Sequence, residues 1–527
     1  MVAGKAERGP GQGGLTEAIA SVGVVAAGHP ATARAAAEVL AEGGNAFDAA
    51  LAALAAACVA EPVLASLGGG GFLLARPAGG EAVLYDFFVA APRRPKPPDD
   101  IDFRAVHADF GPARQEFHIG LGSVATPGVV AGMFAVHDDL GRLPMARIVA
   151  PAVAFARDGL PVDPVQADIL EIVAAIFTAS PESLALYGSR RGPGLVRAGE
   201  RLSLPELAAT LAALAAAGPD LFYRGEIGAR LVTENRMHGG HLEAEDLAEY
   251  RVVRRAPLGR RYRGHRILTN PPPSLGGILI AFALALIEAA GGDAEPLALA
   301  RVIAATEQAR IEAGLGVRPA EEAAAAMLDP ALLALYAERL AGRAEAPRGT
   351  THISVIDGAG NAASLSLSNG EGSAVIVPGT GVMLNNMLGE DDVNPAGFHR
   401  WPPGERLASM MAPSLIEAAD GRLIALGSGG SKRIRSAILQ VVVNLLDKGM
   451  APAEAVAASR LHVEGGHLDL EPGFPPADRA ALIAAFPDHR LWPRPSMYFG
   501  GVQVAVVGIG GPAGGGDSRR GGVVEIV

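Results

Sequence analysis

The residues best suited to covalent chemistry in this 527-residue chain lie in the stretch TTHISVIDGAGNAASLSLSNG, residues 350–370. It opens with Thr350, whose hydroxyl is a weak nucleophile unless a base removes its proton. Cleavage of the peptide bond between Gly349 and Thr350 would free an α-amine with a pKa of about 7.7 to 8.0, partly neutral at physiological pH. A preceding glycine allows the strained backbone that an internal N-to-O acyl shift needs. The pattern therefore suggests a threonine that becomes reactive once the chain is cut before it.

The segment that carries Thr350 is predicted to form a β-hairpin. Apolar and polar residues alternate over residues 351–357 and again over residues 362–368, as in half-buried strands, and residues 358–361 have turn chemistry. Thr350 then lies at the start of the first strand. An ordinary hairpin without a catalytic threonine is the alternative interpretation, because many strands begin with two threonines.

Further motifs distinguish the two interpretations. With MLNN at residues 383–386 and GSGGSKRI at residues 427–434, the 350–370 segment resembles the gamma-glutamyltransferase family of N-terminal-nucleophile hydrolases. EGGNAFDAA, LGGGGFLLAR and YDFFVAAP, within residues 42–92, also follow this family. The resemblance implies that Thr350 is both the self-cleavage site and the nucleophile, with its freed amine as general base. It also implies an α+β fold, a four-layer αββα sandwich formed jointly by the segments before and after residue 350.

The resemblance assigns further roles around the nucleophile. Ser368 stands where the family has a threonine whose hydroxyl contacts the nucleophile's amine, and serine keeps that donor and acceptor. Gly429 and Gly430 match the family's Gly-Gly loop, whose backbone amides stabilise the developing oxyanion. A simple turn before the following helix is compatible with the same glycines. Asn385 and Asn386 match the family's LNN, and either the substrate or the adjacent turn accounts for them.

The substrate-recognition positions depart from the family. Where members that handle γ-glutamyl groups read roughly DFRE, with an arginine for the α-carboxylate, this chain reads DFFV and has Phe88. A phenyl ring has no donors and no charge, so it cannot replace a guanidinium clamp. Met387 and Glu390 replace a polar residue and an aspartate, and a paired serine motif is reduced to Ser409 and Met410. These departures predict retained acyl-transfer chemistry with altered specificity.

Other residues near the predicted site have open roles. Four basic side chains are candidates to receive a carboxylate from another direction, or are surface charges: Arg406, Lys432, Arg433 and Arg435. His352 is expected to shape the strand rather than to do chemistry. The segment 388–407 is shorter than the lid region of many relatives, which predicts a more open cleft.

Composition excludes several other functions. The formal net charge of -11 argues against a nucleic-acid surface. The single cysteine, Cys58, rules out an intrachain disulfide. His107, His118 and His137 lack metal-ligand spacing, so no metal and no cofactor is implied. The glycines of residues 68–71 lack the lysine of a phosphate-binding loop, so we prefer a close-packed turn to a nucleotide site.

The N-terminal part of the chain predicts a location and a first set of elements. Residues 1–20 carry glycines and charges where a signal peptide needs an apolar core. The apolar stretch 46–60 contains Asp48 and is too short to span a bilayer. We therefore expect a cytoplasmic protein without a membrane partner. A strand, a helix ending at Gly43 and Gly44, and a second, buried helix from Asn45 are predicted here.

The whole chain is expected to have three parts. Residues 1–22 form a flexible lead, residues 23–349 a large-subunit segment, and residues 350–527 a small-subunit segment that begins with the nucleophile. The last two make one composite domain, so the two cleavage products would remain associated with each other.

The predicted activity is cleavage of a small-molecule amide, γ-glutamyl or related, through an acyl-enzyme that passes its acyl group to water or an amine. An acylase or amidohydrolase for non-glutamyl amides is one alternative. A catalytically silent, unprocessed homologue that acts as a binding protein is the other.

Overall fold

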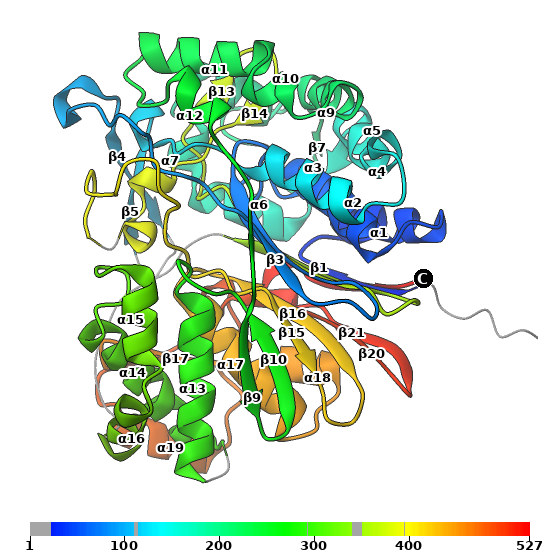
Figure 1. The fold of residues 1–527 in the computed structure, drawn as a ribbon. Helices are drawn as coiled ribbons and strands as arrows, with labels where there is room; N and C mark the ends of the chain where they lie inside the picture. Colours follow the sequence, from blue (N-terminus) through cyan, green and yellow to red (C-terminus); the bar gives the residue numbers. More distant parts are fainter. Residues whose placement is uncertain (1–22, 110–113, 292–293, 340–349, 395) are drawn as a thin grey trace, which may run out of the picture.

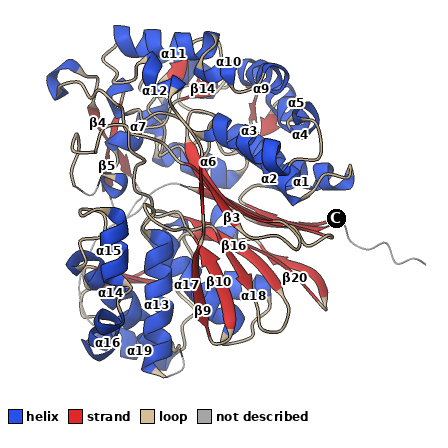
Figure 2. Ribbon diagram, viewed as in Figure 1, coloured by secondary structure: helices blue, strands red, loops and turns tan. Residues whose placement is uncertain are grey.

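The computed structural model describes residues 23–109, 114–291, 294–339, 350–394 and 396–527. The predicted flexible lead and Gly349 lie outside these ranges. The fold is a mixed α/β arrangement in which two large sheets run through the middle and helices lie above and below them (Figures 1 and 2). Among the described residues, no helix combines the length and apolar character that crossing a bilayer would require.

The first large sheet has seven strands in the order β22-β1-β11-β12-β2-β3-β8, and every neighbouring pair is antiparallel. Three of its strands follow residue 350 in the sequence and four precede it. In spatial order the strands are β22 (Val523–Ile526), β1 (Gly23–Ala27), β11 (Thr351–Asp357), β12 (Ala362–Ser368), β2 (Gly70–Arg76), β3 (Val83–Phe87) and β8 (Val253–Arg255).

The second large sheet has six antiparallel strands in the order β21-β20-β16-β15-β10-β9. They are β21 (Gly511–Gly515), β20 (Gly501–Gly508), β16 (Leu423–Gly429), β15 (Ser414–Glu417), β10 (His265–Thr269) and β9 (Leu258–Tyr262). Strands β11 and β12 of the first sheet contact β16 of the second, so the two sheets pack against each other. The smaller sheets comprise β4 (Arg104–Asp109), β5 (Arg114–Ile119), β6 (Leu160–Pro161), β7 (Arg201–Leu202), β13 (Ile376–Val377), β14 (Val382–Met383), β17 (Leu461–Glu464), β18 (His467–Leu470) and β19 (His489–Leu491).

Helices cover the outer side of each large sheet (Figure 1). On the side of the seven-stranded sheet lie α1 (Pro30–Ala41), α2 (Ala46–Ala60), α3 (Val129–Leu140), α4 (Met145–Ile148), α5 (Ala150–Asp158), α6 (Pro164–Ile172), α7 (Ala174–Phe177), α8 (Pro181–Tyr187), α9 (Pro205–Ala217), α10 (Asp220–Tyr223), α11 (Glu226–Met237) and α12 (Ala244–Ala248). On the side of the six-stranded sheet lie α13 (Gly276–Ala290), α14 (Pro296–Glu312), α15 (Ala320–Met327), α16 (Pro330–Arg339), α17 (Arg433–Leu446), α18 (Pro452–Ala457) and α19 (Pro476–Ala485).

The N-terminal elements confirm the sequence prediction. Strand β1 is followed by α1, and α2 begins after Asn45, whose side chain accepts hydrogen bonds from the backbone of Phe47 and Asp48. Asp48 in turn accepts from the amide of Asn45, so the two side chains form a capping box. Every residue of α2 is buried, which fits a helix of almost uniformly apolar composition packed on β11 and β12.

The predicted hairpin is confirmed at both of its strands, β11 and β12, but its burial differs from the prediction. Both strands are buried along their whole length rather than on one face. Ile353 and Val355 join the core under the helices, whereas the hydroxyl of Ser354 donates to the carbonyl of Gln503, 3.1 Å away in β20. The polar face is therefore buried because the second sheet covers it.

Candidate active site

Thr350 immediately precedes the first hydrogen-bonded pair of the hairpin, Thr351 with Leu367, and is itself buried. It lines a small cavity of about 30 Å³, whose walls come from both sides of residue 350 in the sequence. The cavity is lined by Phe88, Thr350, Ser368, Met387, Glu390, Asp392, Val393, Ser409, Met410, Met411, Ser431 and Ile434.

Seven of the residues singled out from the sequence line one cavity, although they come from five separate segments. Phe88 follows β3, Ser368 ends β12, and Glu390 lies between two short 3-10 turns. Ser409 and Met410 lie in the loop before β15. The sequence resemblance therefore placed distant residues at a common location that hydrophobic patterning alone could not have connected.

The cavity has an apolar wall in which Phe88 is held firmly. Its ring is 1% exposed and stacks on that of Phe72, with centroids 5.4 Å apart. The carbonyl of Phe88 accepts hydrogen bonds of 2.7 Å from the Tyr250 hydroxyl and from Nη1 of Arg406. The lining also contains three methionines, whose flexible side chains adapt to a ligand more readily than branched ones do: Met387, Met410 and Met411.

A polar group that sequence analysis missed also lines the cavity. Asp392 lines the cavity, accepts a short hydrogen bond from the hydroxyl of Ser431, and lies 3.5 Å from Nζ of Lys432. Lys432 also pairs with Glu464 at 3.1 Å. Burial acts to lower the pKa of Lys432, but these two carboxylates outweigh it and raise the pKa above its usual value. The EDD triplet at residues 390–392 was the available signal for Asp392.

Four cationic side chains were candidates to receive a substrate carboxylate. In the structure each of them forms an ion pair with a carboxylate of the protein. Arg406 pairs with buried Asp86 at 3.3 Å and lies over the ring of Tyr250. Its Nη2 donates to the carbonyls of Asp86 and Arg251. Arg406 is thus a structural residue that holds the segment after β3.

The three other candidate cations are held in the same way. Arg433 is fully buried, lies over the ring of Tyr498 and is 3.7 Å from Glu464. Arg435 pairs with Glu307 at 2.7 Å, and Lys432 has the two carboxylates described above. None of the three is therefore a simple surface charge.

The predicted Gly-Gly loop packs directly on Thr350. A Cβ built on Gly429 would lie 1.8 Å from the carbonyl oxygen of Thr350, so no other residue type fits there without displacement. Gly430 has φ +120°, a conformation that L side chains rarely adopt, and its Cβ would meet Gly500 at 2.8 Å. The next residue, Ser431, lines the cavity.

The two asparagines of the LNN motif make hydrogen bonds to backbone groups rather than line the cavity. Asn385 donates to the carbonyls of Gly68 and Ala125 at 2.8 and 2.9 Å, and accepts from the amides of Ala125 and Met387. Asn386 accepts from the amides of residues 371 and 372. These contacts favour the turn alternative over direct substrate contact.

Two serine hydroxyls at the cavity accept hydrogen bonds from backbone amides. Oγ of Ser368 accepts from the amide of Gly370 at 3.1 Å, and Oγ of Ser409 accepts from the amide of Met411 at 3.0 Å. The carbonyl of Ser409 accepts from the Ser274 hydroxyl at 2.9 Å. Backbone amides therefore hold both serine hydroxyls at the cavity.

His352 is buried between the sheets. Its ring nitrogens lie 2.8 Å from Oγ of Ser366 and 3.0 Å from Oγ of Ser354, and burial lowers its pKa to about 3. A Cβ on Gly427 would lie 2.3 Å from the ring, so the second sheet closes directly over it. A neutral, enclosed ring of this kind fits the expected role in shaping the strand.

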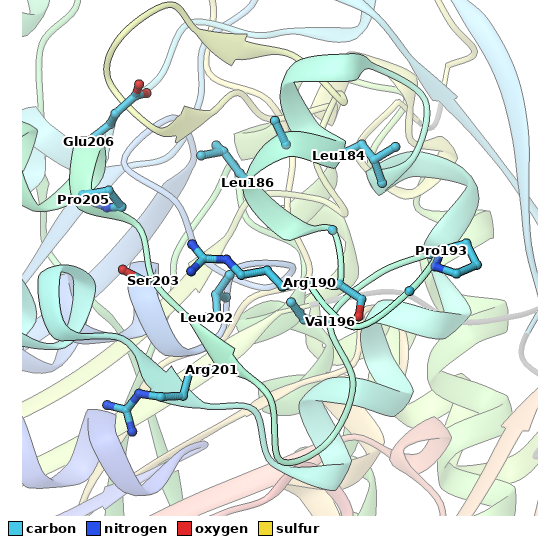
Figure 3. A pocket seen from close by; sticks show the side chains of 15 residues that line it. Leu184, Leu186, Arg190, Pro193, Val196, Arg201, Leu202, Ser203, Pro205 and Glu206 are labelled. Carbon is cyan, nitrogen blue, oxygen red and sulfur yellow. The ribbon is translucent and has the colours of Figure 1, made fainter.

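The open cleft expected from the short 388–407 segment is not observed, because a cavity of about 30 Å³ holds roughly one water molecule. A larger hollow of about 450 Å³ lies between residues 184 and 206, where Arg190 and Arg201 project from its wall (Figure 3). It contains none of the predicted site residues. The cavity at Thr350 is consequently the candidate active site.

Comparisons with known proteins show the family of this chain. The Gamma-glutamyltranspeptidase family matches residues 32–527. The Acylase ACY 1 proenzyme of Pseudomonas sp. (strain V22) is 33% identical over 497 residues, covering 89% of this chain and 87% of the relative. The Glutathione hydrolase proenzyme of Escherichia coli (strain K12) is 30% identical over 508 residues, covering 88% and 85%.

The fold also has a solved counterpart. The crystal structure of cephalosporin acylase from Bacillus halodurans superposes with a TM-score of 0.80 at 25% sequence identity, covering 99% of both chains. The family match includes every residue of the cavity and all strands of the two large sheets except β1. This chain is therefore an enzyme that belongs to the gamma-glutamyltranspeptidase family of N-terminal-nucleophile hydrolases.

Proposed function

We propose that this enzyme cleaves itself between Gly349 and Thr350 and then uses Thr350 as the nucleophile of an acylase for amides whose acyl group is not γ-glutamyl. The position of Thr350 at the cavity and the close approach of Gly429 support its role as nucleophile. The proenzyme names of the relatives support the cleavage step.

Self-cleavage would proceed by an acyl shift. Oγ of Thr350 attacks the carbonyl carbon of Gly349, the peptide C–N bond breaks, and the hydroxyl proton moves to the nitrogen that becomes the α-amine of Thr350. Water then hydrolyses the ester, leaving a carboxylate on Gly349 and restoring the hydroxyl. The amides of Gly429 and Gly430 are proposed to stabilise the oxyanion in acyl transfer.

Amide cleavage would use the same hydroxyl. The freed α-amine takes the proton of Oγ as this oxygen attacks the substrate carbonyl, and it passes the proton to the departing amine. The acyl-enzyme ester is then attacked by water, or by a second amine, which releases the acid or a new amide. Ser368 is proposed to orient the α-amine through its hydroxyl.

The acyl group is inferred from one observation: Phe88 and Thr350 line the same cavity, and no Lys or Arg is among the described residues that line it. A γ-glutamyl group carries an α-carboxylate that needs a buried cationic or hydrogen-bonding partner. Phe88 with the three methionines offers an apolar surface instead. The relatives named as acylases support the same choice.

The architecture proposed with this function is a four-layer αββα sandwich. Residues 23–349 and 350–527 would form one composite domain after cleavage. The contacts of α2 with β11, of β11 with β16, and of α17 with β16 support that order of layers.

The experiment that tests the proposal combines mass spectrometry with a substrate panel. Purified protein is expected to give two chains that end at Gly349 and begin at Thr350. Aliphatic and aromatic acyl p-nitroanilides should be turned over with a higher kcat/KM than γ-glutamyl-p-nitroanilide. A single intact chain that hydrolyses no amide would contradict the cleavage and the nucleophile, and a preference for the γ-glutamyl substrate would contradict the acyl assignment.

A further inference from the structure

A buried carboxyl group contacts the residue that follows the nucleophile. Glu61, which directly follows α2, is 0% exposed, and its Oε2 accepts a hydrogen bond of 2.6 Å from the hydroxyl of Thr351. Its Oε1 accepts a bond of 2.7 Å from the hydroxyl of Thr32 in α1. Both oxygens of one side chain are therefore fixed by threonine hydroxyls, one before and one after residue 350.

This contact lies at the end of the strand that carries Thr350. The register between β11 and β12 runs from Thr351, so Thr351 is the first strand residue after Thr350. The carbonyl of Thr350 accepts a hydrogen bond of 3.3 Å from Nη1 of Arg520, a buried arginine whose pKa desolvation lowers to about 10. The Thr350–Thr351 peptide is thus held between Arg520 at the carbonyl and Glu61 at the next side chain.

The space around the contact is closed. A Cβ built on Gly28 would lie 2.8 Å from Oε2 of Glu61 and 2.9 Å from Oγ1 of Thr351. Burial raises the pKa of Glu61, and the charged or titratable groups that face it are Cys58, His29, Asp163 and Arg520. The mechanism proposed above uses neither Glu61 nor Thr351. Both side chains are nevertheless buried in this enclosed space and hydrogen-bonded to each other.

We propose that Glu61 is a positioning residue, which acts through the hydroxyl of Thr351 to fix Thr350 in the orientation that self-cleavage and acyl transfer require. The inference rests on the proposed role of Thr350. A misplacement of about 1 Å at a reacting group costs on the order of 100-fold in rate, so the loss of this one contact should be measurable.

The test compares Thr351→Val, which removes the hydroxyl at nearly constant shape, with Thr351→Ser, which keeps it. In the full chain, Thr351→Val is expected to slow the appearance of the two cleavage products by roughly 10- to 100-fold. In material that has matured, it should lower kcat by a similar factor with little change in KM. Thr351→Ser should restore both rates to near the wild-type values.

Glu61→Leu and Thr32→Val test the other side of the contact. Glu61→Leu removes both acceptor oxygens and is expected to slow maturation and turnover at least as much as Thr351→Val does. The double variant Glu61→Leu/Thr351→Val should be little slower than Glu61→Leu alone, because both substitutions remove the bond between these two residues. Thr32→Val leaves the hairpin untouched and should give a smaller slowing. If a substitution at residue 351 prevents folding, the rates of Thr32→Val still test the role of Glu61. Thr210→Val, which removes another buried hydroxyl far along the fold in α9, is the matched control.

Two outcomes separate this inference from the proposed function. If the wild-type chain is not cleaved before Thr350, the proposed function fails. If the wild type is cleaved, while Thr351→Val and Glu61→Leu mature and turn over at wild-type rates, only the positioning role is overturned. Equal slowing by Thr210→Val would also overturn it, since the effect would then be general destabilisation.

Discussion

Gly429 approaches Thr350 so closely that a Cβ on the glycine would lie 1.8 Å from the carbonyl oxygen of the threonine. Gly429→Ala must therefore move the loop or the threonine, and we expect it to abolish maturation and amide turnover. Gly510→Ala is the control, because a Cβ there meets nothing within 4 Å. Intact-mass spectra of both variants measure the result. Normal processing of Gly429→Ala would show that the close approach is not required.

Replacement of the nucleophile should separate chain cleavage from folding. Thr350→Ala is expected to remain one chain of 53.7 kDa and to lose amide turnover by on the order of 10⁴-fold or more. Thr350→Ser keeps a hydroxyl and should mature, at a lower rate. Denaturing electrophoresis and a p-nitroanilide assay measure both effects, and cleavage of Thr350→Ala at the same bond would exclude the threonine as the attacking group.

Specificity is predicted to depend on Phe88. Phe88→Arg would place a guanidinium beside the cavity, where a charge-assisted pair with a substrate carboxylate contributes about 1.5 to 3 kcal/mol. We expect kcat/KM for γ-glutamyl-p-nitroanilide to rise by roughly 10-fold or more, and that for apolar acyl substrates to fall. Phe88→Leu, which adds no charge, should not gain γ-glutamyl turnover. A Phe88→Leu variant with the same gain would show that size rather than charge is responsible.

Arg406 is predicted to contribute to stability rather than to substrate binding. Arg406→Met leaves Asp86, which is fully buried, with Arg255 as its remaining ion-pair partner, and should lower the free energy of unfolding by about 3 kcal/mol. Arg254→Met breaks a more exposed pair with Asp139 and should cost less than about 1 kcal/mol. Urea unfolding measures both. A raised KM without loss of stability would instead indicate that Arg406 binds the substrate.

His352 gives the stability a predictable pH dependence. Its pKa is about 3 in the fold and near 6.5 when exposed, so the unfolded chain takes up the proton first as the pH falls. The free energy of unfolding that depends on neutral His352 is fully present above pH 6.5. It decreases between pH 6.5 and 3, by about 1.4 kcal/mol per pH unit.

A variant without the imidazole tests this dependence. His352→Gln should show a shallower loss of unfolding free energy between pH 7.5 and 5.5, whereas His107→Gln, at an exposed position, should keep the wild-type slope. Equal slopes in all three proteins would place the ring in a solvated environment.

The hairpin shows how far local pattern determines structure. Alternation and turn chemistry predicted both strands and the turn between them, because these depend on residues close in sequence. The burial of both faces was not predicted, since the covering strand β20 begins 144 residues after β11 ends, at Gly501. The αββα layering, the domain division and the roles of the site residues remain predictions.

The site residues show the same limit. Phe88, Glu390 and Met410 were identified because motif resemblance carries information about distant contacts that periodicity lacks. The ion pair of Arg406 could not be predicted, because its partner, Asp86, lies on a strand far earlier in the chain. Asp392 and Ser431 were missed, because they lie 39 positions apart and no local pattern shows that they line one cavity.

The seven-stranded sheet has a consequence for the fate of the cut chain. Strand β1 hydrogen-bonds to β11 on one side and to β22 on the other, while β12 hydrogen-bonds to β2. Scission before residue 350 would create two new termini, but the two pieces would stay joined, since separating them would break these three ladders of the seven-stranded sheet as well as the ladder between β10 and β15 in the second sheet. The cleaved protein should therefore unfold in a single transition and elute as one species in size-exclusion chromatography. Its two chains should separate only in denaturant.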